Sequence, residues 1–112
     1  MGYVEQAEKA FKNGKTENLT PTYVEWENEG QVIVGELKGV VSIKSNKNEG
    51  IYNQYMFDTD DGLLKFHLGM VTDGEAGSVM EVGGIYHIEY QGQIKIGGGK
   101  NVNKFHVERI YA

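Results

Sequence analysis

Hydrophobic and polar residues alternate along much of this chain in the way that is typical of half-buried β-strands. The alternating runs are residues 51–59, 63–68, 85–90 and 104–111. A longer run, residues 31–45, has an apolar face at every second position from Ile33 to Ile43, and that face includes Val41 and two glycines, Gly35 and Gly39. Glycine inside a strand is typical of a bend or a bulge. We therefore expect this strand to curl and to serve two parts of a small barrel.

The N-terminal segment follows a different pattern. Val4, Ala7 and Phe11 recur at spacings of three and four, which predicts a short helix over residues 3–11. A polar stretch follows as far as Thr20, and residues 23–27 then predict a short strand. We expect Trp26, in that strand, to cap the end of the barrel rather than to stack on a ligand.

The order of these elements favours one fold. The pair Asp61-Gly62 is a hairpin signal between the second and third barrel strands. Residues 69–82 lose the alternation and predict an irregular crossover or a short helix near residues 78–82, and residues 91–101 predict a glycine-rich, lysine-bearing loop between the last two strands. Five strands in this order match the OB-fold, a Greek-key barrel, within an all-β class. An SH3-like small barrel is the alternative.

Length and composition set the domain organisation. The chain has 112 residues with no cysteine, one proline and 16 glycines. This length predicts one domain, which we divide into a short helix with a loose segment over residues 1–20 and the barrel over residues 21–112. The N-terminus has no apolar run of signal-peptide length, and no segment approaches a membrane span. We therefore expect a cytoplasmic protein with no membrane partner.

The charge is unevenly distributed. The net charge of −5 argues against a nucleic-acid binder. However, residues 31–57 carry three lysines against two acids, and residues 90–112 carry three lysines and one arginine against one acid. Residues 58–89 carry seven acids against one lysine. The cationic potential is thus concentrated in two stretches, which is compatible with an acidic total.

Alternation assigns the aromatic residues of the barrel strands to two faces. Tyr55 and Phe57 share one face of their strand, while Tyr52 lies on the other. In the next strand the apolar positions Leu64, Phe66 and Leu68 predict a core face, which leaves Lys65 and His67 outward. We expect Tyr52, Lys65 and His67 on the outer surface, with Tyr52 the best candidate to stack on a base.

Lysines flank the two predicted loops. These candidate phosphate contacts are Lys38, Lys44, Lys47, Lys95, Lys100 and Lys104. Most surface lysines are simply solvated. These six are candidates for phosphate contacts only because they lie beside or within the predicted loops. A flexible cationic loop above a sheet with stacking side chains is what single-stranded nucleic acid requires.

Other chemistry has little support. The run Gly97-Gly98-Gly99-Lys100 lacks the spacing of a phosphate-binding loop and precedes a strand. The acids from Asp58 to Asp61 lack the later bidentate acid of a calcium loop. The histidines His67, His87 and His106 have no local ligand spacing, although the sequence leaves a three-histidine site open. We expect no enzyme activity, no metal and no cofactor.

Several short segments resemble the small single-stranded DNA-binding proteins encoded by bacteriophages. They are Thr22-Tyr23-Val24-Glu25-Trp26 with Gly30, Val34-Gly35-Glu36-Leu37, residues 84–92, and Gly99-Lys100-Asn101 leading into Phe105-His106-Val107. The resemblance implies an OB-fold that coats single-stranded DNA without base specificity during phage DNA replication or recombination, in the cytoplasm of a bacterial host. It also implies replication or recombination proteins as further partners.

Two alternatives stay open at this point. The acidic stretch 58–89 would repel a polyanion and favours a phage protein-interaction or assembly module on a small β-barrel. RNA binding, or an inhibitory role on the same fold, is a third interpretation, since the contacts that separate RNA from DNA depend on geometry. The oligomeric state also stays open, because an exposed edge strand or the helix at residues 3–11 would suit a homo-oligomer.

Overall fold

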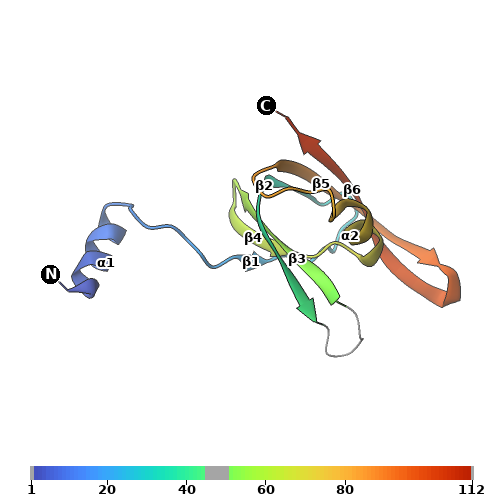
Figure 1. The fold of residues 1–112 in the computed structure, drawn as a ribbon, viewed down its shortest axis with the longest axis horizontal. Coiled ribbons are helices and arrows are strands. Elements are labelled where there is room, and N and C mark those ends of the chain that lie inside the picture. The colour runs from blue at the N-terminus through green and yellow to red at the C-terminus, as the bar shows by residue number, and fades with distance from the viewer. Residues whose placement is uncertain (1, 45–50, 112) are drawn as a thin grey trace.

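The structure is a computed structural model that describes residues 2–44 and 51–111, without the side chains at positions 51, 70, 96 and 100. Within these ranges the elements, in chain order, are α1 (Tyr3–Lys12), β1 (Thr22–Tyr23), β2 (Val32–Lys44), β3 (Ile51–Thr59), β4 (Gly62–Phe66), α2 (Met70–Ala76), β5 (Ile85–Ile96), a 3₁₀ turn (Gly97–Gly99) and β6 (Lys100–Ile110). Figure 1 shows the strands gathered into one body, with α1 at the far end of an extended segment.

The described strands form one open mixed sheet in the order β1-β4-β3-β2-β5-β6. All pairs are antiparallel except β1 with β4. The all-β class with a short N-terminal helix is therefore confirmed. The short strand expected at residues 23–27 is confined to Thr22–Tyr23, and it joins the five barrel strands in the sheet by pairing in parallel with β4.

Strand β2 holds the two halves of the sheet together. Its first part, Val32–Glu36, pairs with β5, and from Gly35 onward it pairs with β3. A Cβ atom at Gly35 would collide with the backbone carbonyl oxygen of Asp58 on β3, so glycine permits the close approach. The expectation that one long strand serves two parts of the fold is confirmed.

A bulge at Lys38 reverses the alternation along β2. The register with β3 shifts between Leu37 and Gly39. Before the bulge Leu37 is buried, whereas after it Val40 is the residue that pairs with buried Tyr55. Val41, expected inward, is 60% exposed. That prediction is wrong because one extra residue moves every later side chain to the opposite face.

The hydrophobic core lies on the predicted side of β3 and β4. Tyr55, Phe57 and Phe66 are fully buried, and Leu68 is nearly so. Their aromatic rings pack together, with Phe57 edge-on to Phe66 at a centroid distance of 5.0 Å. Burial of large rings dominates the stability of a small core such as this one.

Trp26 packs on this core rather than outward, in agreement with the prediction. Its ring lies edge-on to Phe66 on β4 and to Phe105 on β6, at centroid distances of 5.4 and 5.0 Å. Its Nε1 atom donates a hydrogen bond to the carbonyl oxygen of His67 at 3.0 Å. Strands β4 and β6 are separated by three strands in the sheet order, so a side chain that touches both requires the sheet to curl.

The crossover contains its helix earlier than expected. Helix α2 spans Met70–Ala76 rather than the region near residues 78–82. The Tyr55 hydroxyl donates to the Asp73 carboxylate, and Asn53 Nδ2 donates to the same oxygen at 3.1 Å. These contacts with β3 hold the helix in place. They join residues far apart in the chain, so the local sequence, which contains Gly74, does not predict a helix at this position.

The segment expected as a loop, residues 91–101, is mostly a β-ribbon. Strand β5 continues to Ile96, and the pairing resumes at Gln93 with Asn103 after a register shift that follows Tyr90. Gly92, with φ of 88°, lies in that shift. The prediction of a long loop is wrong. The bulge interrupts the alternation after Tyr90, the strand then continues beyond it, and the turn is confined to Gly97–Gly99.

Candidate nucleic-acid interface

Three rings form a row across the outer face of β1, β4 and β3. His67 directly follows β4, with Tyr23 of β1 on one side and Tyr52 of β3 on the other. The centroid distances from His67 are 5.6 Å to Tyr23 and 5.0 Å to Tyr52. Tyr23 is 41% exposed and Tyr52 is 37% exposed. We call Tyr23, His67 and Tyr52 the aromatic row.

A hydrogen bond fixes one end of the aromatic row. It joins Tyr23 Oη and His67 Nε2 at 2.6 Å. Partial burial lowers the pKa of His67, against a smaller opposing effect of Asp73. Burial, with contributions from Glu25 and Tyr52, raises the pKa of the Tyr23 hydroxyl. At neutral pH the tyrosine is therefore the donor and the uncharged imidazole the acceptor.

Lys65 lies beside the aromatic row. It pairs with Tyr23 in β1 and with Met56 in β3. Directly paired residues point to the same face of a sheet, so Lys65 shares the outer face with Tyr23. The residue is half-buried. The structure thus brings together the three residues predicted to lie outward, Tyr52, Lys65 and His67.

The other predicted lysines are dispersed. Lys38, at the bulge of β2, forms an ion pair with Glu36 at 3.0 Å, and this hydrogen bond raises the pKa of Lys38. Lys44 pairs with Ile51, which places it on the face opposite Tyr52. Lys95 and Lys104 are exposed on the β5–β6 ribbon.

Two lysines of the set receive no structural description. Lys47 lies outside the described residues, and Lys100 is described only as the first backbone position of β6. The predicted loop that was to gather Lys95, Lys100 and Lys104 is a paired ribbon instead.

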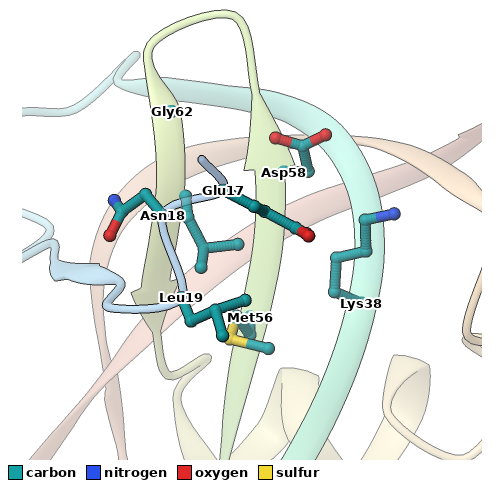
Figure 2. Close-up of a pocket in the computed structure, with 8 residues that line it drawn as sticks. Glu17, Asn18, Leu19, Lys38, Met56, Asp58 and Gly62 are labelled. Carbon is teal, nitrogen blue, oxygen red and sulfur yellow. The ribbon is translucent and has the colours of Figure 1, made fainter. Parts of the chain in front are cut away.

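A hollow of about 390 Å³ lies on the same outer face, further along β3 and β4. Met56 and Leu63 line it from the sheet, and Glu17 and Leu19 line it from the segment of residues 13–21, which we call the N-terminal arm. Figure 2 shows the arm crossing in front of β4 and β3, with Leu19 beside Met56. Lys38 and Asp58 stand at the far side of the hollow.

The acidic run near Asp58–Asp61 and the glycine run Gly97–Gly99 both form turns. Thr59 Oγ1 accepts from the Asp61 amide at 3.1 Å and donates to the Gly62 carbonyl at 2.8 Å, which makes residues 59–62 a tight hairpin turn. Gly98 and Gly99 have φ of 79° and 74° in the turn between β5 and β6. Within residues 2–44 and 51–111 no three His, Cys, Asp or Glu side chains cluster as metal ligands would.

Sequence reasoning missed Tyr23 and Leu19. The partner of Tyr23 is 44 residues away in the chain, and Leu19 lies in a stretch without periodicity. A weak indication existed for Tyr23, since alternation in residues 23–27 puts it opposite the core residue Trp26. Leu19 gave none.

Comparisons of the chain with protein-family models, with curated proteins and with solved structures gave no match. None of the helices in the described ranges has the length and apolar character needed to cross a membrane.

Proposed function

We propose that the protein is a non-catalytic OB-fold that binds single-stranded DNA without sequence preference, in phage DNA replication or recombination. The OB-fold is supported by the antiparallel chain of β3, β2 and β5 around a shared, bulged β2, with a helix between β4 and β5. The contact of Trp26 with both Phe66 and Phe105 supports closure of the curled sheet towards a barrel. In OB-folds the strands equivalent to β3 and β4 carry the oligonucleotide.

The aromatic row is the observation that carries the proposal. The neighbouring rings of Tyr23, His67 and Tyr52 would offer successive bases a stacking surface, and stacking contributes about 1–3 kcal/mol per base. Every base has a π-face, so such a surface accepts any sequence. Lys65, which pairs with Tyr23 of the row, supplies a charge for the phosphate backbone.

The proposal is tested by fluorescence-anisotropy titration of a labelled thirty-nucleotide oligo-dT at low and at physiological salt. We expect salt-sensitive binding to the single strand and much weaker binding to a duplex of equal length. An oligo-U of the same length compares RNA with DNA. Absence of single-strand binding even at low salt would refute the function.

A protein-interaction or assembly module is the second candidate. The observation in its favour is the set of exposed apolar side chains outside the aromatic row, which includes Tyr3, Val4 and Phe11 on α1. On this alternative the oligo-dT titration gives no binding, whereas sedimentation of the pure chain or of a mixture with host replication proteins reveals an association.

A further inference from the structure

The hollow under the N-terminal arm has a composition that selects for one part of a nucleic acid. Its floor and near wall are aliphatic, formed by Met56, Leu63 and Leu19. Its charged lining is two carboxylates, Glu17 and Asp58, against one ammonium, that of Lys38. A phosphate would be repelled by this excess of negative charge, whereas an uncharged planar base would bury apolar surface there.

The hollow lies on the same face of the sheet as the aromatic row. Met56 lies on the same face of β3 as Tyr52, four residues further along the strand. Leu63 likewise shares a face of β4 with Lys65. A DNA strand that leaves the row and follows β3 and β4 therefore reaches the hollow on the same face of the sheet.

We propose that the hollow is a binding site for a single unstacked nucleobase, closed on one side by Leu19 of the N-terminal arm. The inference deepens and rests on the proposed single-stranded DNA binding. The volume of about 390 Å³ falls within the range of small-molecule pockets, roughly 300–1,000 Å³. The apolar contacts of Met56, Leu63 and Leu19 impose no hydrogen-bond pattern on the base. The arm is thus part of the binding site and not only a connection to α1.

Leu19 gives the cleanest variant. Its side chain is 76% exposed, so Leu19→Ala removes the wall without disturbing the core. We expect Leu19→Ala to weaken oligo-dT binding by about three- to tenfold, at the low end of the loss for an aromatic stacking residue. The salt dependence should not change, because no phosphate contact is lost. Leu19→Met should restore the affinity, and Val79→Ala, at an exposed site after α2, should have no effect.

A strand built from abasic nucleotides separates base contacts from backbone contacts. Leu19→Ala and the unmodified protein should bind this strand equally, since it offers nothing to the hollow. Equal binding of oligo-dT by both proteins would overturn the inference, and so would tighter binding by Leu19→Ala, which would make the arm an obstruction. In either case a loss of affinity for Tyr52→Ala would leave the proposed function standing. Failure of the unmodified protein to bind oligo-dT would instead remove both.

Discussion

The two halves of the sheet present outer faces of opposite character. On β1, β4 and β3 the outward residues include the aromatic row and Lys65. On β5 and β6 the outward residues are paired across the strands as Ile85 with Ile110, His87 with Glu108, and Glu89 with His106. His106 Nε2 donates to Glu108 Oε1 at 2.6 Å within this second set, which we call the β5–β6 face.

The difference indicates which half can hold a polyanion. Both faces use the same alternation of a half-buried strand, so backbone geometry does not distinguish them. The aromatic row shares its face with one cation, Lys65. The β5–β6 face carries the carboxylates of Glu89 and Glu108, which repel phosphate, and Glu108 accepts a hydrogen bond from His106. Glu89 and Glu108 therefore lie away from the aromatic row, whereas Glu17 and Asp58 line the hollow further along its face.

Removal of one ring should have the largest effect. We expect Tyr52→Ala to weaken oligo-dT binding by about tenfold or more, since it deletes a stacking platform. The half-exposed side chain is outside the core, so thermal unfolding should change little. The matched control is His87→Ala on the β5–β6 face. An equal loss in both variants, measured by anisotropy, would abolish the distinction between the faces.

Features that depend on local alternation could be predicted from the sequence, whereas features that depend on contacts between distant residues could not. Alternation in residues 51–68 placed Tyr52, Lys65 and His67 outward because β3 and β4 run without interruption. The same reasoning failed for Val41, since the bulge at Lys38 shifts the alternation. The glycines Gly35 and Gly39 indicated an irregularity in that strand, but not its position.

The missing part of the site depends on pairings that local sequence does not encode. Tyr23 joins the aromatic row only because a two-residue strand pairs with β4. Leu19 reaches the hollow because that pairing directs the N-terminal arm across the sheet. Likewise, residues 91–101 were expected as a loop because glycine and lysine are common in loops, whereas cross-strand pairing with β6 makes them a ribbon.

Loss of the cation should have a smaller and more specific effect. We expect Lys65→Gln to reduce the slope of log affinity against log salt by about 0.7, the value for one contact with a single strand. Over a fourfold rise in salt, the unmodified protein should therefore lose about threefold more affinity than Lys65→Gln does. Titrations at several salt concentrations measure it, with Lys9→Gln on α1 as the control. An unchanged slope would place the phosphates elsewhere.

The pH dependence should separate the histidine of the aromatic row from those of the β5–β6 face. Burial lowers the pKa of His67, so the unfolded chain takes up this proton first as the pH falls. Stability is therefore lost from about pH 6.5, the unfolded pKa, downwards until the folded form is protonated. DNA affinity should rise over the same range, since a polyanion favours the charged ring. Urea unfolding and anisotropy at several pH values test both trends, which His67→Gln should remove and His106→Gln should keep.

The smallest expected effect comes from changing the β5–β6 face itself. Glu89→Gln with Glu108→Gln removes two negative charges from the half of the sheet opposite the aromatic row. Charges separated by more than a Debye length, about 10 Å at 0.1 M salt, are largely screened. We therefore expect less than a twofold gain in oligo-dT affinity at physiological salt, rising modestly at low salt. A large gain that persists at physiological salt would mean that the DNA passes over both faces, and that the contrast between them does not determine where it binds.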